Sequence, residues 1–372
     1  MDFTSLANEI FRGILDFGWQ SAVMILVGMV LIALAIIKQY EPVLLLPIGF
    51  GCILANLGMS IDHGLFKVLY DAGIKSELFP LLIFVGVGAM IDFRPLLAMP
   101  QMVLLGAAGQ FGIYATLILA ALLGFPLNQA ASIGVIGAID GPTAIFVTSK
   151  LAPELLGPIA VAAYSYMSLI PIIQPPIMRL MTSKKERSIR MEYAAKPVSD
   201  KAIIAFPVVV TIVVSLIAPD AAPLIATLML GNLLRESGVV DRLRKSAENE
   251  IINIATLFLG LSIGATMTGT SFLNMQTIMV LALGLLAFVL DTVAGLLFGK
   301  LMCFVTRGKV NPLIGACGIS AFPMAGRLSA QMALEEDPHN YILMHAMGSN
   351  TAGQLGSVIA GGLLLALVSG MI

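Results

Sequence analysis

Gly134-Val-Ile-Gly-Ala-Ile-Asp140-Gly-Pro-Thr-Ala144-Ile-Phe146 places one carboxylate beside a helix breaker inside an apolar run. Gly141 and Pro142 interrupt the backbone hydrogen bonds of a helix next to Asp140, so carbonyl and amide groups are left free there. In hydrocarbon, free backbone groups are tolerated only where they line a water-filled or ion-filled cavity. This pattern predicts a cation site within a membrane. The alternative is a turn at the membrane surface, but the flanking residues bring no other charge.

The composition of the whole chain is that of a polytopic membrane protein. Of its 372 residues 58% are hydrophobic and 12% are charged, and no soluble core of this size could hide so much apolar surface. The 21 basic and 22 acidic side chains give a net charge of -1, which lacks the basic excess typical of proteins that bind nucleic acid. With 36 glycines, the helices are expected to pack closely, because lipid offers them no hydrophobic drive to associate.

The apolar segments predict about ten spans. The basic stretch Lys184-Lys185-Glu186-Arg187 divides them and is placed in the cytoplasm by the positive-inside rule. We therefore expect an N-terminal span in residues 1–42, a first repeat in 43–181, a basic linker with a connecting span in 182–221, and a second repeat in 222–372. The segments behind this count are about 19–37, 43–57, 80–91, 102–123, 155–180, 202–218, 223–234, 251–267, 278–298 and the segment around Asn350.

The two halves of the chain resemble each other, as the halves of many transporters do. Gly137-Ala-Ile-Asp-Gly-Pro142-Thr-Ala144 aligns with Gly318-Ile-Ser-Ala-Phe-Pro323-Met-Ala325, and both contain Gly-x4-Pro-x-Ala. Upstream of these motifs, Ile83-Phe-Val-Gly-Val-Gly-Ala89 resembles Leu257-Phe-Leu-Gly-Leu-Ser-Ile-Gly-Ala265. Each match is weak alone, and their common order along the chain supports a repeat.

Counting spans from the cytoplasmic linker predicts how each broken segment lies. The span before Asp140 ends outside and the span after it begins outside. The Asp140 segment must therefore dip into the membrane and return as a re-entrant hairpin. The same count makes residues 312–333 re-entrant from the cytoplasmic side. An odd number of spans separates the halves, so the repeats are inverted and their hairpin tips are expected to meet near the midplane.

Polar residues gather at or beside these hairpins, and the set is Asn311, Ser320, Asn350 and Tyr166. A hard cation such as Na⁺ prefers oxygen ligands, which carboxylate, amide, hydroxyl and free carbonyl groups supply. For each polar residue alone, a modest helix–helix hydrogen bond is an equally good explanation.

Arg327 follows Phe322-Pro-Met-Ala-Gly326 in the second hairpin. An arginine within lipid costs at least about 2.5 kcal/mol, so a cavity-facing guanidinium is expected to bind something. Its forked donors suit a planar carboxylate. The alternative is an arginine at the membrane surface.

Several long motifs, in order along nearly the whole chain, resemble the membrane beta subunit of the sodium-pumping, biotin-dependent decarboxylases. That family acts in oxaloacetate, glutaconyl-CoA, methylmalonyl-CoA and malonate decarboxylases. The motifs are Gly137-Ala-Ile-Asp140-Gly-Pro-Thr, Ala163-Tyr-Ser-Tyr166-Met, Pro171-Ile-Ile-Gln-Pro-Pro176, Asn311-Pro-Leu-Ile-Gly315-Ala-Cys-Gly-Ile-Ser320 and His345-Ala-Met-Gly-Ser-Asn350.

The resemblance implies a function and a set of site residues. The subunit would decarboxylate carboxybiotin, export Na⁺ and consume a proton from outside. Asp140 and Asn350 would hold Na⁺, Arg327 would bind carboxybiotin, and the ion or proton pathway would include Tyr166, Asn311, Gly315 and Ser320.

The resemblance also implies partners and a location. These are a biotin carrier subunit, a carboxyltransferase alpha subunit, a small membrane-anchored gamma or delta subunit, and a homotrimer in the inner membrane. No Met-Lys biotinyl motif occurs in this chain, so the biotin would arrive on another one. The physical argument alone leaves a second function open, a Na⁺-coupled secondary transporter of an organic anion.

Overall fold

The computed structural model describes residues 17–59, 61–192 and 198–371, and all regular structure within these ranges is helical. The prediction of an all-α protein is confirmed. In a membrane, helices satisfy their own backbone hydrogen bonds, which explains why the long apolar runs adopt no other regular structure.

In the half of the chain before the basic linker, the first element is α2 (Trp19–Ile37), a helix long and apolar enough to cross a membrane. Its apolar residues end at Lys38, and Pro42 opens the next helix at a position where its missing amide costs nothing. The remaining elements of this half are α3 (Pro42–Asn56), α4 (Gly64–Leu69), η1 (Tyr70–Lys75), α5 (Leu78–Met90), α6 (Arg94–Ala98), α7 (Met102–Ala108), α8 (Phe111–Leu122), α9 (Leu127–Gly134), η2 (Val135–Ala138), α10 (Gly141–Leu151), η3 (Pro153–Leu155), α11 (Leu156–Ser168) and α12 (Ile170–Met181).

The second half contains α19 (Met275–Val305) and α21 (Leu343–Ser369), which are the two longest helices described. The other elements from the linker onward are α13 (Lys184–Arg187), α14 (Asp200–Ile217), η4 (Pro219–Ala221), α15 (Ala222–Glu236), α16 (Asp241–Ser246), η5 (Ala247–Ile251), α17 (Ile252–Thr266), α18 (Gly269–Phe272), η6 (Pro312–Cys317) and α20 (Met324–Glu336).

By length and composition, six helices in the described ranges could cross a membrane, and up to eight if each of two bent pairs is one span. The bent pairs turn by 57° before α5 and by 64° between α11 and α12. The chain is therefore a multi-pass membrane protein. Helices such as α3 and α15 have 15 residues, fewer than the roughly 20 that a full crossing needs, so the figure of about ten spans stays a prediction.

The segment around Asp140 folds back on itself as a helical hairpin. Its first arm is α9 with η2, and its second arm is α10. The side-chain amide of Asn128, near the start, donates to the carbonyl of Leu151, near the end, at 2.8 Å. Gln129 and Glu154 join the same two ends at 2.8 Å. Both ends of this first hairpin therefore lie on one side of the molecule, with the break at Ile139 and Asp140 at the far end.

The segment from Pro312 to Glu336 forms a second hairpin, with η6 and α20 as its arms. Asn311, before the first arm, and Asn340, after the second, both donate to the carbonyl of Arg187 at 2.9 Å. The arms are joined by Ser329, whose hydroxyl donates to the carbonyl of Leu313 at 3.2 Å. The two ends of the second hairpin therefore lie together against the basic linker.

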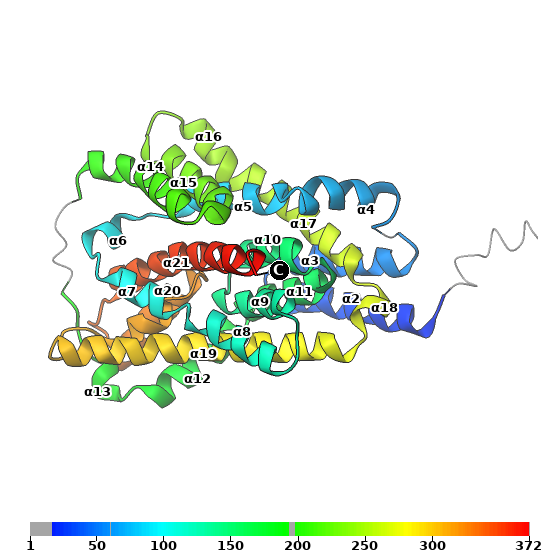
Figure 1. The fold of residues 1–372 in the computed structure, drawn as a ribbon. Coiled ribbons are helices and arrows are strands. Elements are labelled where there is room, and N and C mark those ends of the chain that lie inside the picture. The colour runs from blue at the N-terminus through cyan, green and yellow to red at the C-terminus, as the bar shows by residue number, and fades with distance from the viewer. Residues whose placement is uncertain (1–16, 60, 193–197, 372) are drawn as a thin grey trace, which may run out of the picture.

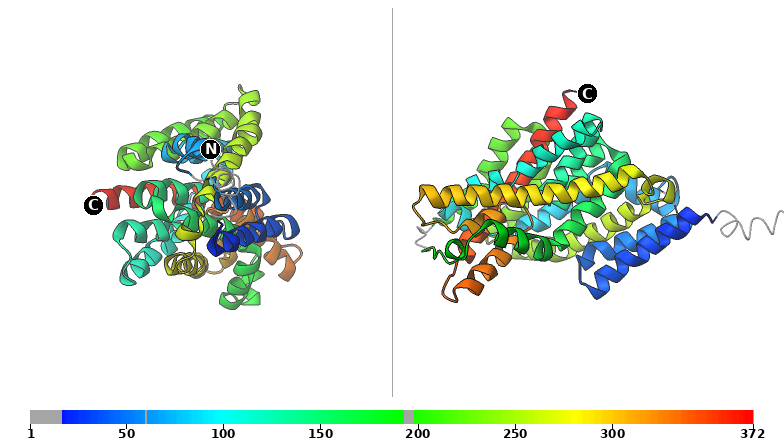
Figure 2. Two further views of the ribbon diagram at one scale, coloured as in Figure 1. Left: turned by 90° about the vertical axis from the view of Figure 1, so that its right-hand side faces the viewer. Right: turned by 90° about the horizontal axis from the view of Figure 1, so that it is seen from below.

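The two hairpins meet where each is broken. The hydroxyl of Ser320, in the break of the second hairpin, donates to the carbonyl of Ala138, at the end of η2, at 2.6 Å. α21 runs through the middle of the molecule past this junction, with α14, α15 and α16 on one side and α19 on the other (Figure 1), and the left view of Figure 2 keeps this order. Apolar side chains of η2, η6 and α21 share one buried cluster, which contains Ile136, Leu313 and Val358.

The linker after α12 is fastened to the end of α20 by two ion pairs. Arg187 contacts Glu336 at 2.6 Å, and Arg190 donates to the carboxylate of Asp337 at 3.0 Å. The hydrogen bond from Arg190 lowers the pKa of Asp337 to about 2. The pair is therefore charged throughout the physiological pH range and holds the base of the second hairpin.

Candidate cation site

The site begins where the first hairpin is broken. Ile139 has φ +52°, a left-handed conformation that is strained for a β-branched residue. Asp140 follows in extended backbone and caps α10, and Pro142 occupies its first turn. The break predicted at Asp140 is therefore confirmed, and the carboxylate sits at the N-terminus of a helix, where negative charge is favoured.

Asp140 is 5% exposed, and its carboxylate accepts hydrogen bonds only from neutral groups. Its Oδ2 atom accepts from Thr143 Oγ1 at 2.7 Å, Ser357 Oγ at 2.9 Å and Gln354 Nε2 at 3.0 Å. Its Oδ1 atom accepts only a long contact from the Thr143 amide, at 3.5 Å. No cationic side chain in the described ranges pairs with it. A carboxylate buried without an opposite charge is costly, so this arrangement favours a bound cation at the open oxygen.

The break of the second hairpin adds further oxygen atoms. The Asn350 amide donates from Nδ2 to the carbonyl of Ile319 at 2.7 Å, while its buried Oδ1 atom has no hydrogen-bond partner among the residues described. Gln110, between α7 and α8, donates to the carbonyl of Gly318 at 3.2 Å and to that of Gly353 at 3.3 Å. Asn350 therefore stands beside Ser320 and one helical turn before Gln354, with an oxygen atom available to a ligand.

A cavity of about 360 Å³ reaches both breaks. Asp140, Ser320 and Gln354 line it, together with Glu41 and with Glu248, which is paired with Arg244 at 3.2 Å. An acidic lining attracts cations and repels anions. The cavity is therefore a suitable route for a cation to Asp140.

The described residues contain no group of three or more His, Cys, Asp or Glu side chains that could hold a metal ion. The groups at Asp140 that could bind a cation are one carboxylate and nearby amide and hydroxyl oxygen atoms. Such a set suits a hard cation of low charge better than a transition metal.

Tyr164 faces this cavity, whereas sequence analysis selects Tyr166. The ring of Tyr164 packs against Gly141 so closely that a Cβ atom there would lie 2.0 Å from a ring carbon. Its buried hydroxyl has no hydrogen-bond partner. Tyr166 instead donates to the carbonyl of Leu281 at 2.5 Å, on α19.

None of the remaining sequence-predicted residues, Asn311, Gly315 and Arg327, is among the hydrogen-bond partners of the Asp140 carboxylate or lines its cavity. The Asn311 side chain is occupied by the carbonyls of Arg187 and Ile189 and by the amide of Leu313. Gly315 packs on α19, where a Cβ atom would lie 2.1 Å from the carbonyl oxygen of Gly295. Arg327, on α20, is exposed, and in the described ranges its guanidinium has no ion pair or hydrogen bond.

Three residues that sequence analysis did not select bind Asp140 directly: Thr143, Gln354 and Ser357. Thr143 is three residues after Asp140, the spacing of a helix cap. Gln354 and Ser357 follow Asn350 by four and seven residues, so all three share one face of α21. Gln354 and Ser357 could have been predicted from the sequence by their helical spacing from Asn350.

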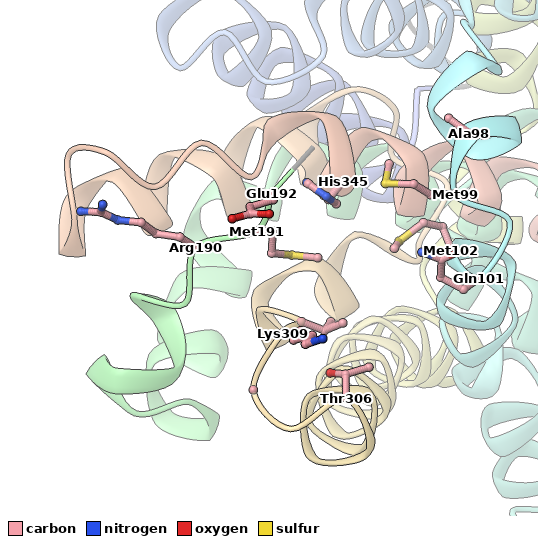
Figure 3. A pocket seen from close by; sticks show the side chains of 12 residues that line it. Ala98, Met99, Gln101, Met102, Arg190, Met191, Glu192, Thr306, Lys309 and His345 are labelled. Atoms are coloured by element: carbon pink, nitrogen blue, oxygen red, sulfur yellow. The ribbon is translucent and has the colours of Figure 1, made fainter. Parts of the chain in front are cut away.

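A second cavity, of about 620 Å³, opens beside the linker (Figure 3). Side chains from α7, the linker, the segment after α19 and the start of α21 surround it, and they include Met102, Arg190, Lys309 and His345. Arg190 is bound to Asp337, whereas Lys309 is exposed. This cavity is more basic than the one at Asp140.

Comparison with known proteins gives one consistent family. Residues 20–368 match the family described as Na⁺-transporting oxaloacetate decarboxylase beta subunit. The chain is 52% identical to the glutaconyl-CoA decarboxylase subunit beta of Acidaminococcus fermentans, over 96% of both chains. It is 52% identical to the methylmalonyl-CoA decarboxylase subunit beta of Veillonella parvula, over 98% of this chain and 97% of that one. It is 45% identical to the oxaloacetate decarboxylase beta chain of Klebsiella pneumoniae, over 96% of this chain and 98% of that one. The chain therefore belongs to the family of Na⁺-transporting oxaloacetate decarboxylase beta subunits.

Proposed function

We propose that this chain is the membrane subunit that decarboxylates carboxybiotin and uses the reaction to export Na⁺ while a proton is taken up. The observation that carries the proposal is the Asp140 carboxylate, which is buried at the junction of the two hairpins with no cationic side chain of the described residues paired to it. The beta-subunit names of its relatives support the same function. A Na⁺-coupled transporter of an organic anion, left open by the physical argument, has no such support.

Na⁺ would bind between the two hairpins, held by Asp140 and by the free Oδ1 atom of Asn350. Ser320 adds a hydroxyl oxygen at the junction, where it also joins the hairpins. Asn311 and Gly315 lie in the same hairpin as Ser320, and their contacts suit them to shaping the site from its base. Either tyrosine of the Tyr164-Ser-Tyr166 motif could pass a proton, and the position of Tyr164 beside Gly141 favours it.

Arg327 would hold the carboxylate of carboxybiotin, because its guanidinium is exposed and no described residue competes for it. In the reaction the bond between the ureido nitrogen and the carboxyl carbon breaks, and CO₂ leaves. The electron pair stays on the nitrogen, which takes up one proton. Arginine suits the reactant because its paired donors match a planar carboxylate.

The coupling has an energetic requirement. Moving one positive charge outward against 100 mV costs about 2.3 kcal/mol. Decarboxylation before Na⁺ is loaded would release the free energy as heat. The shared junction suits this requirement, because a cation between the hairpins and a carboxylate near Arg327 would both act on the second hairpin.

At the level of the fold, we propose two inverted repeats with re-entrant hairpins and about ten spans. Each hairpin has its two ends joined, by Asn128 in the first and by Asn311 and Asn340 in the second, which supports this arrangement. The partners would be a biotin carrier, a carboxyltransferase alpha subunit and a small membrane-anchored gamma or delta subunit, in a complex with a trimer of this chain. We place the chain in the inner membrane.

The acyl substrate of the complex is inferred from length and identity. The two acyl-CoA decarboxylase relatives align over 361 and 365 residues, and the Klebsiella oxaloacetate relative needs an alignment of 423. The higher identity and matching length favour an acyl-CoA decarboxylase complex.

The test starts with capture of the complex from membranes on avidin, which retains biotin carriers. Free carboxybiotin is then supplied to the solubilised complex, and CO₂ release is measured with and without Na⁺. We expect Na⁺-dependent CO₂ release. Failure of this chain to be retained on avidin, together with Na⁺-driven uptake of an organic anion, would instead establish the transporter.

Two variants test where carboxybiotin binds. Arg327→Ala is expected to lose CO₂ release and to keep Na⁺ binding. Lys309→Ala, which removes an exposed cation from the cavity near the linker, is the matched control and is expected to keep both. Normal CO₂ release in Arg327→Ala with lost release in Lys309→Ala would instead indicate that carboxybiotin binds in that cavity.

A further inference from the structure

A second buried acid, Asp291, lies in the middle of α19. It is 0% exposed. Its Oδ1 atom accepts a hydrogen bond from the backbone amide of Gly112, in the first turn of α8. Its Oδ2 atom is buried and has no hydrogen-bond partner in the described part of the chain. Asp291 has no role in the proposed decarboxylation or in Na⁺ binding at Asp140.

The Asp291 carboxyl packs directly on the first hairpin. A Cβ atom built on Gly137, in η2, would lie 3.0 Å from Asp291 Oδ2. A Cβ atom built on Gly112 would lie 2.6 Å from the carboxyl carbon. Glycine at both positions lets the carboxyl approach the backbone. Gly137 is three residues before Asp140, so the two acids are in contact with the same short segment.

Within residues 17–59, 61–192 and 198–371, no charged group pairs with Asp291. Of the elements packed against α19, α7, α9 and η2 have no titratable side chain. Tyr114 on α8 is exposed, Tyr166 on α11 binds Leu281, Cys317 of η6 binds Ser329, and Arg179 on α12 is paired with Glu335. Tyr164 on α11 lines the cavity at Asp140, and Lys300, on α19 itself, is paired with Glu186. Gln174 on α12 and Thr292 beside Asp291 bind each other.

The magnitudes decide the protonation state. The start of α8 stabilises a negative charge only modestly. Burial of an ion without a partner costs more than this, even after the surroundings relax. A neutral acid leaves one buried hydroxyl without an acceptor, which costs less than an unpaired buried ion. The carboxylic acid is therefore the more stable form in the arrangement of hairpins seen here.

We propose that Asp291 is a proton-binding site linked to Na⁺ occupancy between the hairpins. It holds a proton on Oδ2 in the present arrangement, and it ionises when Na⁺ binding moves η2 and admits water to the carboxyl. In that step the O–H bond breaks, the electron pair stays on Oδ2, and the proton passes to water. This rests on the proposed function and assigns the proton that the cycle takes up to a named residue.

Linkage makes the proposal measurable. If Na⁺ binding releases a proton from Asp291, then protons must weaken Na⁺ binding by the same factor. Wild-type complex without substrate is expected to release protons into a weakly buffered solution when Na⁺ is added. Asp291→Asn is expected to release fewer, by about one per Na⁺-binding event. Its side-chain carbonyl can still accept from the Gly112 amide, so we expect this variant to fold.

Infrared difference spectroscopy gives a readout that needs no turnover. The wild-type complex without Na⁺ is expected to show the carbonyl band of a carboxylic acid that donates no hydrogen bond, and Na⁺ is expected to remove it. The band should be absent from Asp291→Asn and present in Ser262→Ala, which removes another fully buried group bonded only within its own helix.

Three results would overturn the proposal: no such band in the wild type, a band that Na⁺ leaves unchanged, or undiminished proton release from Asp291→Asn. The wild-type measurement stands even if the variant does not fold. It also separates this proposal from the proposed function, because carboxybiotin is absent throughout. A complex that binds Na⁺ with loss of the band and yet fails to decarboxylate carboxybiotin would contradict the proposed function alone.

Discussion

Gln354 donates a hydrogen bond from α21 to the carboxylate of Asp140 at 3.0 Å, and so joins the first hairpin to the helix that carries Asn350. The same helix adds a second donor, Ser357, at 2.9 Å. One face of α21 therefore holds the carboxylate in position and leaves its other oxygen open.

Removing the Gln354 donor is expected to weaken Na⁺ binding. A hydrogen bond to a charged group contributes about 1.5–3 kcal/mol, so Gln354→Ala should reduce Na⁺ affinity about ten- to hundredfold. Equilibrium binding of radioactive Na⁺ to the purified complex measures it. Thr351→Ala is the control, because that hydroxyl donates to Met347 within α21. Equal loss in both variants would show a general effect on the helix.

A side chain at Gly141 is expected to disrupt the site. In Gly141→Ala the new Cβ atom would lie 2.0 Å from a ring carbon of Tyr164, so the ring or the break must move. Overpacking of this kind costs about 1–3 kcal/mol. The melting temperature in detergent should fall, and Na⁺ affinity should fall with it. Gly370→Ala is the control, because its new Cβ atom would lie 3.4 Å from the nearest atom, an ordinary contact distance. This variant should keep both the melting temperature and the Na⁺ affinity of the wild type.

The linker is expected to stay docked throughout the physiological pH range. Because the folded pKa of Asp337 is lowered to about 2, its pairing with Arg190 stabilises the docked linker fully above the unfolded pKa of about 3.9. That stabilisation is lost as the pH falls toward 2. Asp337→Asn should speed tryptic cleavage in the linker at neutral pH. Asp241→Asn removes an exposed acid that is paired with Arg244, away from the linker, and should leave the rate of cleavage unchanged. Similar rates in all three proteins would argue against docking by this pair.

The contacts of Asn311 predict loss of stability rather than loss of Na⁺ affinity. Asn311→Ala leaves the carbonyl of Ile189 and the amide of Leu313 without a partner, at about 1–3 kcal/mol for each that stays buried. The carbonyl of Arg187 loses one of its two donors and keeps Asn340. The yield and the melting temperature should fall, and the folded fraction should bind Na⁺ normally. Asn340→Ala removes a bond to the same Arg187 carbonyl and should show a smaller effect of the same kind. Normal stability with lost Na⁺ binding in Asn311→Ala would make Asn311 a ligand.

Residues close in sequence made the break in the first hairpin predictable. Gly141 and Pro142 forbid a continuous helix beside Asp140, and the helix does end at Ala138 and restart at Gly141. The choice of tyrosine could not be made this way. Tyr164 and Tyr166 are two residues apart on a helix, so their side chains point about 200° apart, and only packing decides which one faces the cavity.

Contacts between distant segments were beyond the sequence pattern. The sequence around Asn311 and Asn340 does not predict that both bind the carbonyl of Arg187, because that carbonyl belongs to a linker more than a hundred residues away. Asp291 had a visible signal, since it is the only charged residue between 278 and 298. Its place against Gly137 required the fold.

The most direct measurement of the central claim is Na⁺ binding and Na⁺-stimulated decarboxylation in Asp140→Asn, made in the intact complex. The amide keeps the size of the side chain and loses the charge that holds the cation. We predict that both activities are lost while carboxyl transfer on the partner subunit continues. An Asp140→Asn complex that binds Na⁺ with wild-type affinity and decarboxylates normally would contradict a cation site at Asp140.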